Sequence, residues 1–179
     1  ASVCVNPSWV RLCGGLLRDS GVAVCTVIGF PLRANRSDLK AKETELAAAD
    51  GANEFDMVMH IGRFKDKDFA YVERDIAEVM RAAQNSCASP TLKVILETGF
   101  LDEQEITDAC RIVVAAGADF VKTSTGFGPG GATLAAVGTM RMAVGSHCGV
   151  KASGGIRDRT TALAMIDAGA TRLGTSSGI

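Results

Sequence analysis

The sequence predicts an α/β fold in which parallel strands alternate with helices and close into a barrel of the (β/α)8 type. Three features indicate this fold. Short apolar runs alternate with segments of helical periodicity along all 179 residues. A Gly-Ala turn precedes three of these runs, which is the pattern of a repeated connection from helix to strand. Two runs end in a lysine followed by a loop of small residues, and such barrels build their sites at the carboxyl ends of strands.

Seven apolar runs have the length and the flanking turn residues of strands. Seven strands are one fewer than an eight-stranded barrel needs. We therefore expect a single domain over residues 1–179 that is incomplete at both ends, with the first strand and the last helix of the barrel missing from this chain. The first and last of the seven strands would then flank the gap. The expected strands are residues 2–5, 22–28, 54–59, 92–96, 120–123, 149–152 and 172–174.

Segments between the strands carry helical signals. In residues 69–83, apolar side chains recur three and four positions apart, which predicts a helix with one buried face. Asp102 is followed three residues later by Glu105, which is the spacing of a capping box, so we expect a helix to begin there. No low-complexity linker interrupts the alternation, and this favours one domain.

Composition excludes several classes of protein. The chain is 47% hydrophobic and 22% charged with a net charge of -1, which gives no reason to expect nucleic acid or a membrane as a partner. No apolar run approaches the roughly 20 residues that span a bilayer. Six cysteines form no Cys-x-x-Cys pair, so we expect reduced thiols and a cytoplasmic protein. Only His60 and His147 are present, without ligand-spaced partners, so we expect no metal and no other cofactor.

Lys122 and Lys151 are the most informative residues of the chain. Each closes an apolar run and leads directly into a loop of small residues. If both ammonium groups face one cleft, their repulsion disfavours double protonation and leaves one amine partly neutral and nucleophilic. The pair therefore predicts Schiff-base chemistry. The alternative is that each is a strand-end lysine whose stem lies along apolar surface while its charge stays in water.

The Gly-Ala turns indicate a weak internal repeat. Asp56, Lys122 and Gly174 stand at the same offset after the turns at Gly51, Gly117 and Gly169. Because side chains alternate along a strand, we expect these three residues to face the same way and lie at the same depth. An apolar barrel interior has no use for a charged side chain that neither pairs nor works. For Asp56 the alternative is a buried ion pair with a lysine, which would not exclude catalysis.

Two glycine loops near the end of the chain predict an anion site. Gly154 and Gly155 precede one helix, and residues 174–178 follow the last strand. Backbone N–H groups in such loops, with serine hydroxyls beside them, bind anions. The loops after the last two strands of these barrels commonly hold a phosphate group.

Together these segments resemble the deoxyribose-phosphate aldolase family. The resemblance rests on residues 4–7 (CVNP), 26–31 (TVIGFP), 54–58 (EFDMV), 121–127 (VKTSTGF), 150–156 (VKASGGI) and 174–178 (GTSSG), and so covers essentially the whole chain. It implies a TIM-barrel class I aldolase, a lyase without metal. Such an enzyme reversibly cleaves 2-deoxy-D-ribose 5-phosphate to D-glyceraldehyde 3-phosphate and acetaldehyde, in deoxyribonucleotide and carbohydrate catabolism.

The resemblance also implies roles for individual residues. Lys122 matches the Schiff-base lysine, Lys151 the second lysine beside it, and Asp56 the carboxylate that relays protons. The sequence does not fix the oligomeric state, and a homodimer is the assembly to be tested. The positions that match the phosphate site are Gly126, Gly154, Gly155, Gly174, Ser176 and Ser177.

The chain departs from the family pattern at two positions, and two other functions stay open. Arg33 stands where the family usually has glycine, and His60 where it usually has asparagine. One alternative function is another phosphosugar Schiff-base lyase of the transaldolase type, which would share Lys122 without needing Lys151. The other is a catalytically inactive barrel fragment that binds a phosphate ligand.

Overall fold

The computed structural model describes residues 1–176 and divides the chain into two compact units, Ala1–Lys93 and Val94–Ile179. All seven expected strands are present among the described residues, and they are hydrogen-bonded in the order in which they occur along the chain. Strand β4 (Thr91–Ile95) begins in the first unit and ends in the second. Each unit is described separately below.

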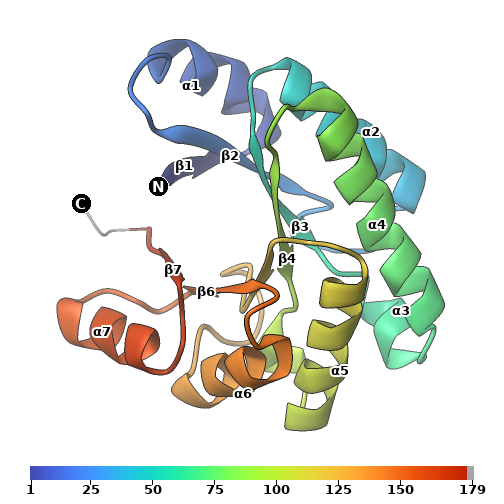
Figure 1. Cartoon of the computed structure of the whole chain (residues 1–179), viewed down its shortest axis with the longest axis vertical. Helices are drawn as coiled ribbons and strands as arrows, with labels where there is room; N and C mark the ends of the chain where they lie inside the picture. The colour runs from blue at the N-terminus through green and yellow to red at the C-terminus, as the bar shows by residue number, and fades with distance from the viewer. Residues whose placement is uncertain (177–179) are drawn as a thin grey trace. The chain divides into compact units, whose positions relative to one another are not determined.

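The first unit carries three complete strands and the start of β4, with helices between them (Figure 1). Strands β1, β2 and β3 are parallel, and Cys4 of β1 lies in register with Cys25 of β2. Every residue of β3 is buried. Helices α2 and α4 pack side by side, and the apolar stripe of α4 faces the core as its periodicity predicts. The elements are β1 (Ser2–Val5), η1 (Pro7–Trp9), α1 (Val10–Leu16), β2 (Ala23–Ile28), α2 (Ser37–Ala49), β3 (Glu54–Val58), α3 (Ile61–Lys65) and α4 (Phe69–Ser86).

The second unit repeats the alternation. Strands β5, β6 and β7 are parallel, and helix α5 packs against α6. Asp102 accepts a hydrogen bond from Glu105 N while the Glu105 side chain accepts one from Asp102 N, so the predicted capping box is confirmed. The elements are η2 (Thr98–Phe100), α5 (Glu103–Ala115), β5 (Phe120–Lys122), α6 (Leu134–Val144), β6 (Gly149–Ser153), α7 (Arg159–Asp167) and β7 (Arg172–Gly174).

The predicted fold class is confirmed. The chain is α/β, the pairs β1–β2, β2–β3, β5–β6 and β6–β7 are parallel, and the seven strands follow one another with helical connections, as the strands of a TIM barrel do. The expectation of a single domain stays a prediction. The expected strand ends differ from the observed ones by one residue at most, as at β3, where His60 caps helix α3 and so ends the extended segment.

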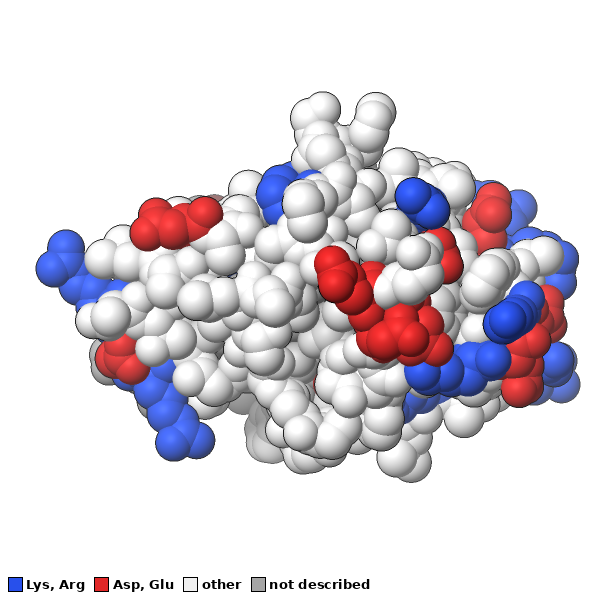
Figure 2. All heavy atoms as spheres, turned by 90° about the horizontal axis from the view of Figure 1, so that it is seen from below, with Lys and Arg blue, Asp and Glu red and all other residues white. Residues whose placement is uncertain are grey.

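Over the described residues, the face of the molecule in Figure 2 has no continuous basic surface of the kind that binds polyanions. Figure 2 shows a face covered mostly by uncharged side chains, with acidic and basic groups close to one another instead of in a basic stripe. Among the described residues, no helix is both long and apolar enough to cross a membrane.

Candidate active site

Lys122 and Lys151 lie next to each other on neighbouring strands. Lys122 ends β5 and is in parallel register with Lys151 on β6, so the two side chains leave the same face of the sheet. Lys122 is 7% exposed and Lys151 is 6% exposed. The predicted pairing of the two lysines is therefore present. Their burial argues against the alternative of strand-end lysines that reach into water.

Hydrogen bonds fix the strand ends that carry the two lysines. Thr123 N donates to Lys151 O at 3.1 Å, and Thr123 Oγ1 donates to Ser153 O at 2.9 Å. Ser153 returns a bond from its N–H to Thr123 Oγ1 at 3.0 Å and another from its hydroxyl to Ser124 O at 2.8 Å. These bonds are buried and mutual. They hold the lysine-bearing ends of β5 and β6 in one arrangement, as a reactive amine requires.

Glu97 holds the loop that follows Lys122. Its side chain is fully buried, and one carboxylate oxygen accepts a hydrogen bond from Thr125 N at 3.1 Å while the other accepts one from the Thr125 hydroxyl. A Cβ at Gly128 would lie 2.6 Å from the Glu97 carboxyl carbon, so the loop backbone passes directly over this group. Glu97 therefore anchors the segment that contains Gly126.

Glycine is required at several positions around the lysines. Gly154 and Gly155 have φ values of 89° and 82°, which ordinary residues rarely adopt, and Gly126 has a φ of 89°. A Cβ at Gly174 would lie 3.2 Å from Lys151 Cε and 2.9 Å from Ser153 Cβ. Gly174 thus leaves room for the stem of Lys151.

Gly174 faces the same way as Lys122, as the repeat predicts. Lys151 is in register with Lys122 and with Arg172, and Gly174 pairs with Ser153, two residues further along, so Gly174 shares the face of Lys122 and Lys151. The equal depth of Asp56, Lys122 and Gly174 stays a prediction, because the strands of a barrel are tilted and register along the ladder is not depth along the barrel axis. Ser176 is described and exposed, and Ser177 lies outside the described residues.

Asp56 lies in the first unit, in a buried cluster of charges. Its Oδ1 is 2.9 Å from Lys93 Nζ, and both side chains are fully buried. Glu54 Oε2 is 2.8 Å from the same ammonium and accepts a hydrogen bond from the Ser2 hydroxyl at 2.8 Å. Burial alone would lower the pKa of Lys93, but the carboxylate of Asp56 and its other neighbours raise it above the ordinary value. The alternative of a buried ion pair at Asp56 is therefore observed.

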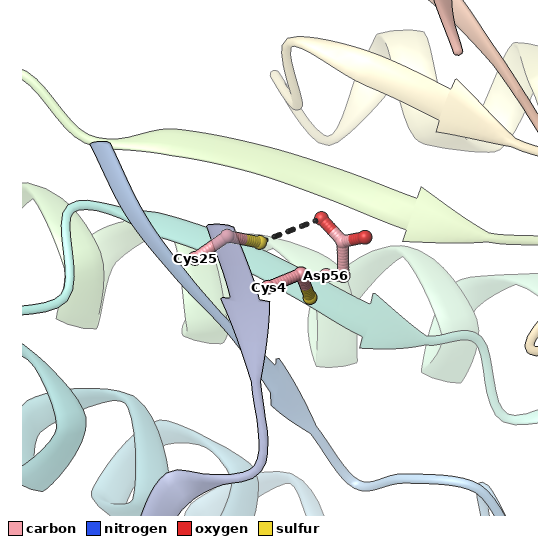
Figure 3. A group of neighbouring side chains, drawn as sticks. All are labelled: Cys4, Cys25 and Asp56. Atoms are coloured by element: carbon pink, nitrogen blue, oxygen red, sulfur yellow. Dashed lines mark hydrogen bonds between the residues drawn. The ribbon is translucent and has the colours of Figure 1, made fainter. Parts of the chain in front are cut away.

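Cysteine side chains complete this cluster. Figure 3 shows Cys4, Cys25 and Asp56 on three adjacent strands, with the Cys25 thiol donating to Asp56 Oδ1 at 3.3 Å. The three ligand atoms lie within 4.8 Å of one another, close enough to share a metal ion. However, the Lys93 ammonium is 3.6 Å from Cys25 Sγ and 2.9 Å from Asp56 Oδ1. Because a positive charge already contacts two of the three groups, we assign no metal to them.

Sequence reasoning missed Lys93, Glu54 and Glu97. Lys93 interrupts the apolar run Leu92 to Leu96, and Glu97 follows that run directly. A charged residue within a buried strand was a usable signal, because it needs a partner. The identity of the partners depends on the register between strands that are distant in the sequence.

A strand–helix alternation with amine groups at the carboxyl ends of neighbouring strands is the arrangement of a barrel enzyme. The model of the DeoC/LacD family of aldolases matches residues 1–179. Deoxyribose-phosphate aldolase 1 of Bacillus licheniformis is 58% identical over 179 residues, which make up 100% of this chain and 79% of that relative. The chain belongs to the DeoC/LacD family of aldolases, and it is a carbon–carbon lyase.

Solved structures agree with this assignment. An aldolase designated QR15 superposes with a TM-score of 0.92 at 46% identity, over 99% of this chain and 77% of that one. The deoxyribose phosphate aldolase of Aeropyrum pernix, described as a tetramer, superposes with a TM-score of 0.88 at 33% identity, over 97% of this chain and 72% of that one. The predicted family resemblance is confirmed.

Proposed function

We propose that this chain reversibly cleaves 2-deoxy-D-ribose 5-phosphate to D-glyceraldehyde 3-phosphate and acetaldehyde through a Schiff base on Lys122. The observation that carries the proposal is the register pair of two buried lysines at neighbouring strand ends. A buried lysine at a strand end can attack a carbonyl carbon once its amine is neutral, and Lys151 is the neighbouring amine in the register. The names of the relatives support the choice of substrate.

The reaction begins when the neutral amine of Lys122 attacks the aldehyde carbon of the open-chain sugar. Loss of water from the adduct gives a protonated imine, which withdraws electrons from the adjacent carbon. Removal of the proton from the 3-hydroxyl then breaks the bond between carbons 2 and 3. This step releases D-glyceraldehyde 3-phosphate and leaves an enamine on Lys122. Protonation of the enamine and hydrolysis release acetaldehyde and restore the amine.

Proton transfers need groups that can both give and accept a proton. We assign these roles to Lys151, which is the register neighbour of Lys122, and to Asp56 acting through water. The hydrogen bonds from Lys93 and Cys25 fix the orientation of the Asp56 carboxylate. The contact with Lys93 also favours the ionised form of that carboxylate.

We assign the substrate phosphate to the glycine loops. Backbone N–H groups at positions with left-handed φ can converge on an anion, and no side chain there obstructs it. The proposed positions are Gly126, Gly154, Gly155, Gly174 and Ser176, together with Ser177, which lies outside the described residues.

Borohydride trapping tests the proposal directly. Reduction of a mixture of the chain and acetaldehyde should fix a two-carbon group on Lys122, located by peptide mass mapping. An adduct on Lys151 with Lys122 unmodified would overturn the assignment. Binding of the phosphosugar without any trapped imine would instead favour an inactive phosphate-binding barrel, and trapping of a ketose in place of acetaldehyde would favour a transaldolase-type lyase.

The phosphate assignment has its own test. Replacing Gly155 by valine should raise KM for 2-deoxyribose 5-phosphate much more than KM for unphosphorylated 2-deoxyribose, because only the former uses the loop. The replacement of Gly15 by valine provides a control outside the site, since a Cβ at Gly15 meets no atom within 4 Å. Equal losses on both substrates would contradict the assignment.

We also propose that the chain self-associates as a homodimer. The relative from Aeropyrum pernix is described as a tetramer, which is a property of that protein. Sedimentation velocity at several concentrations distinguishes a monomer from either assembly.

A further inference from the structure

We propose that Cys4 and Cys25 form a redox modification site, in which a hydroperoxide oxidises the Cys4 thiol and Cys25 then closes a disulfide with it. This goes beyond the aldolase reaction. The proposal starts from the strand register. Cys4 on β1 and Cys25 on β2 are register partners in a parallel pair, so their side chains leave the same face of the sheet.

The geometry permits a bond between the two sulfurs. Neighbouring strands lie about 4.8 Å apart, which falls within the range of roughly 4.4 to 6.8 Å over which the Cα atoms of a disulfide are separated. The Sγ atoms are within 4.8 Å of each other, and neither cysteine is in a disulfide. Side-chain rotation must bring them to about 2 Å, the length of a disulfide bond.

The two thiols differ in access, and this difference assigns their roles. Cys4 is exposed, so a small oxidant reaches it, whereas Cys25 is fully buried. The pKa of Cys25 is raised, chiefly by a hydrogen bond with Cys4 and then by burial, so Cys25 stays a thiol at neutral pH. The exposed cysteine is therefore the one that is oxidised, and the buried one resolves the product.

Asp56 gives the buried thiol a proton acceptor. The Cys25 S–H already points at Asp56 Oδ1 at 3.3 Å, and the Lys93 ammonium lies 3.6 Å from the same sulfur, where it can stabilise a developing thiolate. Glu54 is the remaining ionised group of the cluster, and it contacts Lys93. A resolving thiol thus has both a base and a cation beside it.

The reaction balances in two steps. The Cys4 thiolate attacks the hydroperoxide, the O–O bond breaks, and Cys4 becomes a sulfenic acid while the oxidant leaves as the alcohol or as water. The Cys25 proton then passes to Asp56 Oδ1 as the Cys25 sulfur attacks the Cys4 sulfur, the S–OH bond breaks, and the departing hydroxide takes the proton back from Asp56 to form water. Two electrons pass from the two thiols to the hydroperoxide. A dithiol reductant returns both cysteines to thiols.

Bond formation changes the surroundings of Asp56. The Cys25 sulfur can no longer donate a proton to Asp56 Oδ1, whereas the hydrogen bond from Lys93 to that oxygen is unaffected by the bond between the sulfurs. If Asp56 relays protons as proposed above, oxidation should lower turnover reversibly. The predicted fall in turnover rests on the proposed function. The formation of the disulfide does not.

The test is peptide mapping of the full chain after exposure to hydrogen peroxide and blocking of the remaining thiols. Trypsin places Cys4 in residues 1–11, Cys13 in residues 12–18 and Cys25 in residues 19–33, so every pairing gives a distinct product. We expect residues 1–11 and 19–33 to be joined with the loss of two hydrogens, and dithiothreitol to separate them. Cys4 as a sulfinic acid with Cys25 still a thiol, or Cys4 joined to Cys4 of another molecule, would overturn the proposal.

Variants separate the site from general cysteine reactivity. Cys13→Ser is the matched control, because Cys13 is partly exposed but lies on helix α1 and not on a strand. This variant should link residues 1–11 and 19–33 as the unchanged chain does. Cys25→Ser should form no link and should accumulate a Cys4 sulfenic acid that a cyclic 1,3-dione traps. Linkage without any change in turnover would uphold the modification site and refute only the role of Asp56. The mapping of the unchanged chain decides the proposal even if Cys25→Ser does not fold.

Discussion

Buried lysines occur in both units, but their neighbours differ. In the first unit, Lys93 contacts Asp56 and Glu54, and Lys40 Nζ lies 2.6 Å from Asp75 Oδ2, with all of these side chains buried. In the second unit, Lys122 is the register partner of another lysine, Lys151. The comparison separates two uses of one residue type. A buried lysine that contacts carboxylates supports the structure, whereas the two register-paired lysines at the ends of β5 and β6 stand where barrel enzymes place their reactive groups.

The largest expected effect is on activity. Lys122→Met keeps the volume of the side chain but removes the amine that forms the imine, so the catalytic constant should fall on the order of 10⁴-fold or more. Lys42→Met, at an exposed ion pair, is the control and should retain activity. Because Lys122→Met also removes a like-charged neighbour of Lys151, its loss of unfolding free energy should be smaller than that of the Lys93 variant below. Residual turnover within tenfold of the unchanged chain would show that another amine forms the imine.

The second effect is on stability. Lys93→Met leaves the carboxylates of Asp56 and Glu54 buried without their cation, which should cost about 3 to 5 kcal/mol of unfolding free energy. Urea denaturation measures this loss. Lys42→Met again serves as the control, with an expected change below about 1 kcal/mol because its ion pair with Glu45 is exposed. Comparable losses for Lys93→Met and Lys122→Met would break the distinction between the two units.

The sequence predicted the lysine pair of the second unit but not the ion-pair cluster of the first. Lys122 and Lys151 could be predicted because each stands at a strand end before a loop of small residues, and both signals are local. The partners of Lys93 could not, since they follow from the pairing of β4 with a strand some 37 residues away, which no local pattern specifies. The strands and the capping box at Asp102 were predicted correctly because their signals are also local.

Alkaline pH should reduce the free energy of unfolding of the unchanged chain more than that of Lys93→Met. The pKa of Lys93 is raised above its ordinary value of 10.5, so the folded chain holds this proton more tightly than the unfolded chain. The stability that the cluster contributes is therefore complete below pH 10.5 and is lost as the pH rises from there through the raised value. Urea midpoints of the unchanged chain should fall in this range, and those of Lys93→Met should fall less. Parallel curves for the two proteins would show that Lys93 does not govern the alkaline limb.

A smaller effect is expected at the loop behind Lys122. Glu97→Gln keeps the shape of the side chain but weakens the hydrogen bonds from Thr125, a change of about 1 to 2 kcal/mol for bonds to a charged group. If the loop orients the substrate phosphate, KM for the phosphorylated sugar should rise about tenfold while KM for 2-deoxyribose changes little. A purely structural role would instead lower stability and leave both KM values unchanged.

The smallest effect concerns how each unit accommodates left-handed backbone. The second unit places glycine at its left-handed loop positions beside the lysines, such as Gly154, whereas the first unit places Arg33 at a φ of 61°. A left-handed conformation costs a non-glycine residue roughly 1 to 2 kcal/mol, and glycine avoids this cost but loses more entropy on folding. Arg33→Gly should therefore raise the unfolding free energy by about 0.5 to 1 kcal/mol, measured by thermal and urea denaturation. Arg33→Ala is the matched control, because it removes the same guanidinium but keeps a Cβ. If alanine and glycine change stability equally, the side-chain contacts of Arg33 and not its backbone decide the outcome, and the usual glycine of the family at this position would need another explanation.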